Sequence, residues 1–484
     1  MRHAHRALLL GLVAALAAGA AFAQVDFSHY VALGDSYGAG FTNLSLLQKH
    51  QLNSYPAILA RQTGFAGTFE QPLISEPGIP AELALTALHV VNHSVVPVIA
   101  PKSSSSGLPI NIAYPGIYNN LSIVGASTND LLTLIGTATN LPQDAAKYAQ
   151  GQIGASQLFA DIVLRDGQHT ALQQAIGAQG TFYTVWIGGD DISTAVLTGV
   201  VLDGVTMTTT AAFQQQYGTL LGAIHQQRPN ATIVVANLAD FMLWPFASTI
   251  KPYIVNPANG SHIPLIGENG LLTEQDFVTL SASSLLAQGL GIPTAAGGTG
   301  IPLPEGSIDQ TGLHAGVIIR AAEAAAIRAR TAELNQVIAA VATQTGAKVV
   351  DVAPLWSKLT TGEYLLGGVP ITSAFLTGGV FGYDGFHPTE LGYAIIADEF
   401  VKQMNAQLGT KVPRVNLLPF VTGGSTAGAT SVAAANAVFS AQAATDLVRA
   451  FAPYALTDKL QPGKTVHRRV AALPSVETTG AERP

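Results

Sequence analysis

Short apolar runs alternate along the chain with segments whose apolar residues recur at helical spacing. The runs are rich in β-branched and aromatic residues, which is typical of buried parallel strands. They predict strands at Tyr30–Leu33, Leu121–Val124, Phe182–Ile187, Thr232–Leu238 and Lys348–Val352. This alternation of strands and helices predicts an α/β fold, a three-layer α/β/α sandwich with a mostly parallel sheet.

Three helices follow from the apolar spacing between these runs. Apolar residues at helical intervals predict one helix over 213–224 and a second over 327–341, which Gly346 ends. A third helix is expected to begin near Thr389 and to bury apolar residues as far as Met404.

Two segments interrupt the alternation. Pro72–Tyr118 is rich in proline and serine and is predicted to be a long surface loop. Phe241–Gly312 is rich in glycine and proline, with one helix-like piece at Thr273–Gln288. Because a long insertion is usually functional or mobile, we expect 241–312 to form a lid or a substrate-binding wall over the carboxyl edge of the sheet. An insertion without such a role is the alternative.

The first 23 residues have the pattern of a secretory signal peptide. Arg2 and Arg6 precede the apolar stretch 7–22, and Ala21-Phe22-Ala23 ends it, which predicts cleavage before Gln24 and a secreted or periplasmic protein. A membrane anchor is the alternative, but the apolar stretch is short for a span and rich in alanine and glycine. No later segment is typical of a transmembrane helix.

After the signal peptide at 1–23, we expect one α/β domain over 24–408 and a C-terminal extension over 409–484. In the extension, 427–451 is predicted to form an alanine-rich helix and 461–484 a disordered tail. With 48% apolar and 11% charged residues, the chain has the composition of a compact globule.

Charge and cysteine content exclude some functions. Removal of the signal peptide leaves 21 basic and 30 acidic residues, a net charge of −9, and no basic cluster lies near an aromatic platform. This balance argues against nucleic acid as a partner. The absence of cysteine excludes disulfides and thiolate metal sites.

Candidate chemistry begins where the first predicted strand ends, at Gly34-Asp35-Ser36. A serine at the carboxyl end of a parallel strand lies where ligands bind and is a candidate nucleophile. Asp384 and His387 lie three residues apart before the last predicted helix. A serine nucleophile needs an imidazole base that a carboxylate orients. Taken alone, each motif also fits a plain turn, a helix cap or a surface histidine, but together they predict a triad.

Residues 34–38 also fit the G-x-S-x-G nucleophile elbow of the α/β-hydrolase fold. In that fold the serine follows several earlier strands, whereas Ser36 lies just after the predicted mature N-terminus. The aspartate and histidine of that fold are also usually far apart in sequence. The chain therefore favours a different architecture.

The ordered motifs resemble those of the GDSL, or SGNH, family of serine esterases and lipases. The resemblance covers about 30–408, and its first, second, third and fifth blocks correspond to Gly34-Asp35-Ser36, to Asn120–Ala126, to Ile187–Ile192 and to Asp384–His387. It implies a flavodoxin-like α/β/α sandwich of the SGNH-hydrolase type.

The resemblance also implies a role for each site residue. Ser36 would attack the ester carbonyl, His387 would act as base and then acid, and Asp384 would orient His387. The oxyanion would be held by the backbone N–H groups of Ser36 and Gly125, and by a side-chain amide of the third block. This chain has Asp190 where the family has that asparagine. An ionised carboxylate only accepts hydrogen bonds and would repel an oxyanion.

Two interpretations of function remain. The favoured one is an exported carboxylic ester hydrolase with an acyl-serine intermediate and with no metal or organic cofactor. The other is a non-catalytic ligand- or glycan-binding protein in which Asp190 marks the loss of catalysis. Retention of all three triad residues favours the enzyme. A small-molecule ester, a lipid ester and an O-acetylated polysaccharide are all open as substrates, and the oligomeric state is open too.

Overall fold

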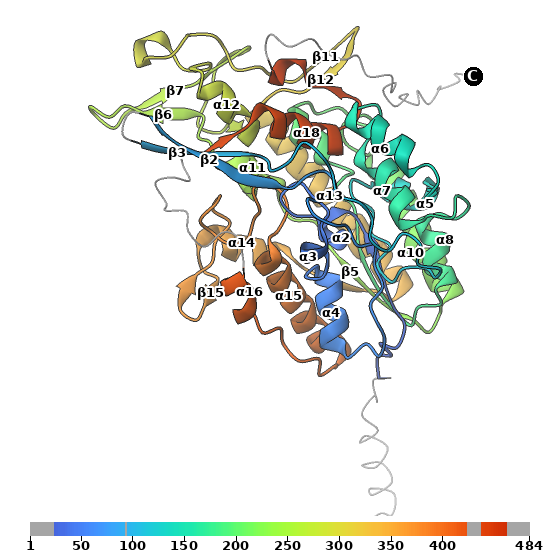
Figure 1. The fold of residues 1–484 in the computed structure, drawn as a ribbon. Coiled ribbons are helices and arrows are strands. Elements are labelled where there is room, and N and C mark those ends of the chain that lie inside the picture. Colours follow the sequence, from blue (N-terminus) through green and yellow to red (C-terminus); the bar gives the residue numbers. More distant parts are fainter. Residues whose placement is uncertain (1–23, 92–93, 424–436, 462–484) are drawn as a thin grey trace, which may run out of the picture.

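The structure, a computed structural model, describes residues 24–91, 94–423 and 437–461 (Figure 1). The predicted signal peptide and residues 462–484 of the predicted tail lie outside the described residues. No helix in the described ranges combines the length and the apolar character needed to cross a bilayer.

A parallel sheet of four strands lies at the centre, which confirms the predicted α/β class. Its strands, in spatial order, are β1 (Tyr30–Gly34), β4 (Phe182–Trp186), β5 (Thr232–Ala236) and β14 (Lys348–Val350). All four correspond to predicted strands. Because β1 pairs directly with β4, the segments that follow these two strands leave the sheet side by side.

The fifth prediction, a regular strand at Leu121–Val124, is wrong. This segment runs parallel to the free edge of β1 but forms only one bridge, between Asn120 and Ala32. Its N–H groups still bond to β1, from Leu121 to Ala32 at 2.8 Å and from Ile123 to Gly34 at 3.0 Å. With this edge segment counted as the second strand, the strand order is the 2-1-3-4-5 of flavodoxin-like folds.

Helices cover both faces of the sheet. On one face lie α4 (Tyr55–Thr63) and α15 (Glu390–Leu408), which pack side by side, and on the other lie α8 (Ala171–Gly177), α10 (Thr210–Gln227) and α13 (Ala321–Thr345) (Figure 1). Alternate residues of β4 serve the two layers: the Trp186 ring lies 5.5 Å from Tyr55 and 6.0 Å from Phe400, whereas Tyr183 donates to the Ala175 carbonyl at 3.1 Å. The three predicted helices are present as α10, α13 and α15.

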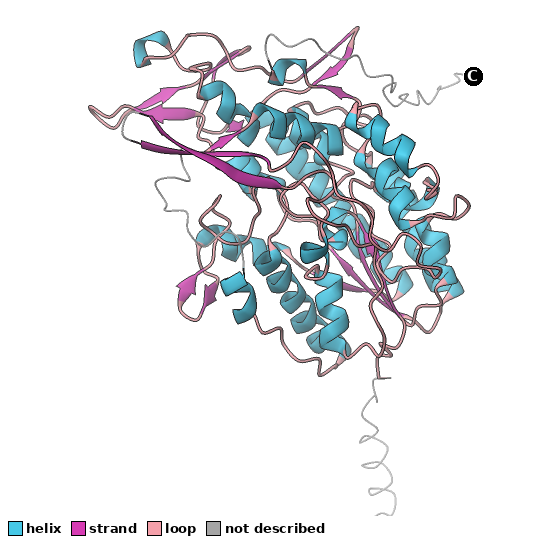
Figure 2. Ribbon diagram, in the orientation of Figure 1, coloured by secondary structure: helices cyan, strands magenta, loops and turns pink. Residues whose placement is uncertain are grey.

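The prediction of a surface loop over Pro72–Tyr118 is wrong for its centre. An antiparallel hairpin, β2 (Leu83–Val91) and β3 (Ser94–Pro101), lies there, apart from the central sheet (Figure 2). Proline usually argues against a strand with partners on both sides, and β3 contains Pro97. The third strand of this sheet, β17 (Val438–Phe439), pairs only with Val98 and Ile99, so its ladder does not reach the proline.

The helix-like piece predicted at Thr273–Gln288 is also wrong. It forms strand β10 (Phe277–Val278), the 3-10 turn η2 (Leu280–Ala282) and the single-turn helix α12 (Ser283–Leu286). Because β10 pairs with β13 (Ile318–Ile319), strand pairing overrides the local helical spacing.

Short elements complete the structure. The helices are α2 (Ser36–Ala39), α3 (Gln48–Gln51), α5 (Thr128–Thr133), α6 (Leu141–Ala149), α7 (Ala155–Val163), α9 (Ser193–Thr198), α11 (Pro245–Ser248), α14 (Ala353–Thr361) and α16 (Leu418–Gly423). The strands are β6 (Tyr253–Val255), β7 (His262–Pro264), β8 (Ile266–Gly267), β9 (Gly270–Leu271), β11 (Ser307–Asp309), β12 (Gly312–His314), β15 (Leu365–Leu366) and β16 (Val369–Pro370). The 3-10 turns are η1 (Phe241–Leu243), η3 (Thr294–Ala296) and η4 (Asp458–Leu460).

The described part of the C-terminal extension packs on the α/β domain. Helix α18 (Ala441–Phe451) lies within the predicted alanine-rich helix, of which 427–436 falls outside the described residues. Strand β17 before it pairs with β3, and β18 (Ala455–Leu456) after it pairs with β12. Strand pairing at both ends therefore fixes α18 against the domain.

Two glycines with different surroundings are expected to change the stability of the protein in opposite directions when each is replaced by alanine. A Cβ at Gly34 would lie 2.5 Å from the Trp186 carbonyl oxygen, whereas one at Gly218 in α10 would meet nothing within 4 Å. We expect Gly34→Ala to lower the free energy of unfolding in urea, and Gly218→Ala to raise it by about 0.5–1 kcal/mol. An unchanged urea midpoint for Gly34→Ala would contradict the packing described here.

Candidate active site

Ser36 lies at the carboxyl end of β1, where the chain turns into the short helix α2. The Asp35 side chain caps this helix by accepting the Tyr37 N–H at 3.0 Å. Ser36 is the first residue of the helix and is 4% exposed. Its place on this edge of the sheet is the one that the sequence predicts.

The structure brings His387 and Asp384 to Ser36. The His387 Nε2 lies 3.0 Å from the Ser36 Oγ, and the His387 Nδ1 lies 3.0 Å from the Asp384 Oδ2. A neutral imidazole that carries its proton on Nδ1 satisfies both contacts, because it donates to the carboxylate and accepts from the hydroxyl. The side chains of His387 and Asp384 are fully buried.

Four donors surround the Asp384 carboxylate. Its Oδ1 accepts the N–H groups of Phe386 and His387, each at 2.8 Å, and its Oδ2 accepts the Leu44 N–H at 2.6 Å as well as the imidazole. Burial alone raises the pKa of Asp384, but the His387 ring and the backbone donors outweigh burial and hold that pKa below its ordinary value. The carboxylate is therefore ionised at neutral pH.

Gly125 follows the edge segment beside β1. Its φ is +76°, and a Cβ there would lie 3.1 Å from the Ala155 Cβ, so only glycine fits without strain. In the described part of the chain, the N–H groups of Ser36 and Gly125 bond to no protein acceptor.

Asp190 follows β4 at the same edge. A Cβ on the preceding Gly189 would lie 3.2 Å from the Asp35 Oδ2, so this turn contacts the start of α2. The Asp190 Oδ1 accepts the Ser193 hydroxyl at 2.9 Å. Burial, and after it the nearby Asp35 carboxyl, raise the pKa of Asp190 well above its ordinary value. A protonated Asp190 has an O–H to donate, which an ionised one lacks.

Asp190 is one of four neighbouring carboxyl groups, the others being Asp35, Asp130 and Asp191. Burial raises the pKa of Asp35 to about 7 and that of Asp130 to about 6, and it raises the pKa of Asp191 too. The Asp191 Oδ2 accepts the N–H and the hydroxyl of Thr128 at 2.9 and 2.8 Å. These bonds join the segment after Gly125 to the turn after β4, a role that the sequence analysis missed.

Aromatic rings surround the His387 imidazole. Its centroid lies 4.9 Å from that of Phe41 and 5.2 Å from that of Phe451 in α18, and the Phe386 ring lies 4.7 Å from Trp244. Phe451 comes from the C-terminal extension and Trp244 from the insertion. Sequence analysis missed both, because neither lies in a motif and the only signal was their apolar character.

The insertion 241–312 begins beside the loop that carries Asp384 and His387. The Phe246 N–H donates to the Gly385 carbonyl at 2.9 Å, and a Cβ on Gly385 would lie 2.6 Å from Leu280. The first part of the insertion therefore packs against the loop that carries Asp384. A lid role for the rest of the insertion stays a prediction.

A cavity of about 690 Å³ lies close to the site. Leu44, whose N–H bonds to Asp384, lines this cavity together with the loop 101–109, α6 and α18. The walls are mainly apolar, and the ion pair of Asp446 and Arg449 supplies a polar part. Among the described residues, no group of histidine, aspartate and glutamate side chains is arranged to hold a metal ion.

The raised pKa of Asp35 predicts a pH dependence of stability. Between about pH 4 and pH 7 the folded protein binds a proton at Asp35 that the unfolded chain has released, so this group makes stability fall as the pH rises. We expect Asp35→Asn, which keeps the helix cap, to lose less stability than the wild type over this range. Urea unfolding at several pH values measures the difference, and parallel curves would contradict it.

The chain is similar to several known proteins. Residues 30–400 match the model of the family described as GDSL-like Lipase/Acylhydrolase. No curated protein matches the chain. Solved structures that are similar to it at low identity include three hydrolases. An extracellular lipase from Streptomyces rimosus is 16% identical, with 78% of this chain and 98% of that chain covered and a TM-score of 0.30. A phospholipase A1 from Streptomyces albidoflavus is 14% identical, with 77% and 98% of the two chains covered and a TM-score of 0.30. A family 3 carbohydrate esterase from Clostridium thermocellum is 12% identical, with 79% and 98% covered and a TM-score of 0.29. The family match covers most of the chain, which therefore belongs to the GDSL-like lipase/acylhydrolase family.

Proposed function

We propose that the protein is an exported carboxylic ester hydrolase with Ser36, His387 and Asp384 as its catalytic triad. The contact between the Ser36 Oγ and the His387 Nε2, 3.0 Å, carries this proposal. Membership of the family supports esterase-type chemistry. The signal-peptide pattern at 1–23 supports export to the periplasm or beyond the cell.

The reaction begins when the Ser36 Oγ attacks the ester carbonyl carbon and the His387 Nε2 takes the hydroxyl proton. The tetrahedral oxyanion accepts from the N–H groups of Ser36 and Gly125. As the alcohol leaves, it receives the proton from His387, and the acyl group stays on Ser36. Water then attacks the acyl-serine with His387 as base, the bond between the acyl carbon and the Ser36 Oγ breaks, and His387 returns the proton to Ser36 as the acid is released. Asp384 stays ionised throughout and stabilises the imidazolium.

Asp190 acts in this proposal as a third oxyanion donor. Burial and the nearby Asp35 carboxyl raise its pKa, which favours the protonated carboxyl, and in this proposal its O–H replaces the N–H of the family asparagine. A carboxylic acid that an apolar site keeps neutral is an established kind of oxyanion donor. The substitution of aspartate for asparagine is then compatible with catalysis.

The substrate in this proposal is an ester with an apolar part, from a small molecule or a lipid. The rings of Phe41 and Phe451 beside His387 and the mainly apolar cavity lined by Leu44 support this choice. An acyl or alkyl chain buried against such walls contributes about 0.8 kcal/mol for each CH₂ group.

We expect Ser36→Ala to lower kcat for p-nitrophenyl acetate by about 10³-fold or more, because the acyl-serine cannot form. Its thermal midpoint should stay that of the wild type, since a small turn side chain contributes little packing. A fluorophosphonate probe should label the wild type at Ser36 and leave the variant unlabelled. Near-wild-type turnover by purified Ser36→Ala would show that Ser36 is not the nucleophile.

A protonated Asp190 predicts different results for two substitutions. Asp190→Asn keeps a donor and should have nearly wild-type kcat/KM at pH 7, whereas Asp190→Ala removes it and should lose about 10²–10³-fold. As the pH rises through the raised pKa, the wild type loses its proton and its activity, and the asparagine variant does not. Three identical profiles of kcat/KM against pH would place Asp190 outside the oxyanion site.

A further inference from the structure

Behind the triad, a tight turn presents the Leu44 N–H to Asp384. Thr42 and Ser45 close the turn, since the N–H of each donates to the carbonyl of the other at 3.0 Å. The two residues between them, Asn43 and Leu44, have φ values of 53° and 57°, as two-residue hairpin turns require. Asparagine adopts this conformation readily, but leucine does so only where its surroundings enforce it. Contacts with other segments must therefore stabilise this turn.

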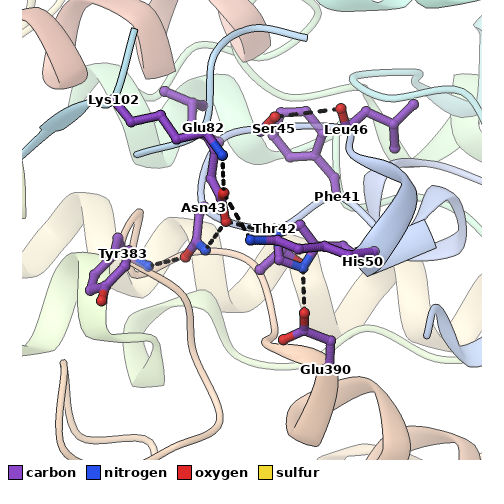
Figure 3. Close-up of polar contacts among 12 residues, drawn as sticks. Phe41, Thr42, Asn43, Ser45, Leu46, His50, Glu82, Lys102, Tyr383 and Glu390 are labelled. Atoms are coloured by element: carbon purple, nitrogen blue, oxygen red, sulfur yellow. Dashed lines mark hydrogen bonds and ion pairs between the residues drawn. The ribbon is translucent and has the colours of Figure 1, made fainter. Parts of the chain in front are cut away.

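The Asn43 side chain makes two of these contacts. Its Oδ1 accepts the Tyr383 N–H at 2.7 Å, directly before Asp384 in the chain, and its Nδ2 donates to the Glu82 Oε1 at 2.8 Å (Figure 3). The amide thus joins the turn to the triad loop on one side and to a buried carboxylate on the other. Glu82 is 5% exposed.

His50 bridges that carboxylate to the helix after the triad loop. Its Nε2 lies 2.8 Å from the Glu82 Oε1, and its Nδ1 lies 2.7 Å from the Glu390 Oε1 (Figure 3). Ionised carboxylates only accept hydrogen bonds, so both ring nitrogens of His50 must carry protons, which makes the ring a cation. Glu390 begins α15, three residues after His387. The 1% exposed His50 ring therefore contacts both ends of the triad loop through its partners.

The charges around His50 stabilise this cation. Burial alone lowers the pKa of His50, but Glu390 and Glu82 outweigh burial and raise it above its ordinary value. On the far side of Glu82, Lys49 and Lys102 donate to its Oε2 at 3.0 and 2.8 Å. Burial likewise opposes ionisation of Glu82, yet His50 and Lys102 hold its pKa below the ordinary value. The cation is lost as the pH rises through the raised pKa of His50.

We propose that His50, Glu82 and Asn43 are positioning residues for the catalytic carboxylate. The His50 cation fixes Glu82, and Glu82 fixes the Asn43 amide. That amide holds the turn whose Leu44 N–H orients Asp384. The inference rests on the proposed ester hydrolysis, because a positioning residue needs a reaction to act on.

The proposal predicts an effect on kcat more than on KM. The Leu44 N–H donates to the same Asp384 oxygen that accepts the hydrogen bond from the His387 Nδ1, so a displaced turn leaves that oxygen free to move. A misplaced carboxylate orients the imidazole poorly in the transition state, whereas the side chains of His50, Glu82 and Asn43 do not line the cavity proposed for the apolar part of the ester. Errors of about 1 Å in such positioning cost up to roughly 10²-fold in rate.

Asn43→Gly is the central test. Glycine keeps the left-handed turn, so the fold is preserved, but both side-chain bonds are lost. We expect kcat for p-nitrophenyl acetate to fall about 10-fold to 100-fold with KM within about threefold. Labelling with a fluorophosphonate counts the active sites, so that kcat is compared per folded site.

Exchanging the amide and the carboxylate between positions 43 and 82 tests whether these two residues act through their contact with each other. Asn43→Asp still accepts the Tyr383 N–H but places a carboxylate against Glu82, so we expect a larger loss of kcat than for Asn43→Gly. Adding Glu82→Gln restores one amide donor and one carboxylate between the two positions. The double variant should recover part of kcat, which simple loss of packing would not produce.

His314 offers a matched control for His50. Its ring is 7% exposed and also lies between two carboxylates, 3.1 Å from Asp309 and 2.9 Å from Asp458, but it joins β12 to the C-terminal extension. Both His50→Gln and His314→Gln should lower the thermal midpoint. At a temperature where both are folded, only His50→Gln should lower kcat.

The outcomes separate the two proposals. If Ser36→Ala is inactive while Asn43→Gly has wild-type kcat, the positioning proposal is wrong and the proposed function stands. Equal losses of kcat in His50→Gln and His314→Gln would also overturn the positioning role. If Ser36→Ala keeps wild-type turnover, both proposals are wrong.

Discussion

The structure depends on keeping one carboxylate ionised where no water reaches it. Asp384 is buried, and an isolated buried carboxylate would take up a proton. Backbone N–H groups at both of its oxygens and the His387 ring prevent this. One of those donors, Leu44, adopts a backbone conformation that leucine rarely adopts, so the stability of the charge is linked to the packing of a turn far away in the sequence.

Two layers of the fold must meet for the site to form. The sheet brings Ser36, Gly125 and Asp190 to one edge, because the edge segment and β4 both run beside β1. The helical layer supplies the other half, since Asp384 and His387 precede α15, which packs on α4. The polar network between His50 and Glu390 ties the segment after β1 to the start of α15. The order of the strands therefore explains the positions of Ser36, Gly125 and Asp190, but not those of Asp384 and His387.

Short sequence patterns predicted strands, helices and the pairing of residues that lie close together in the chain. The short apolar run at Tyr30–Leu33 predicted β1, the apolar stripe at 213–224 predicted α10, and the three-residue spacing of Asp384 and His387 indicated a pair that the structure places together. Contacts between distant residues carried no such signal. His50 and Glu390 are 340 positions apart, and neither belongs to a motif. Phe451 likewise lies beyond the matched family segment, so only its packing against His387 shows that it belongs to the site.

Two groups in this molecule have raised pKa values for opposite electrostatic reasons, and both lose a proton as the pH rises. Burial and like charge keep Asp190 neutral, whereas two carboxylates keep His50 positive. In both cases the folded-state pKa is raised, so each proton is lost as the pH rises through that pKa. Under the two proposals, the first loss would remove an oxyanion donor and add a repelling charge, and the second would weaken the hold on Asp384. The proposed alkaline limit of activity is therefore set by two groups, one in the proposed oxyanion site and one outside it.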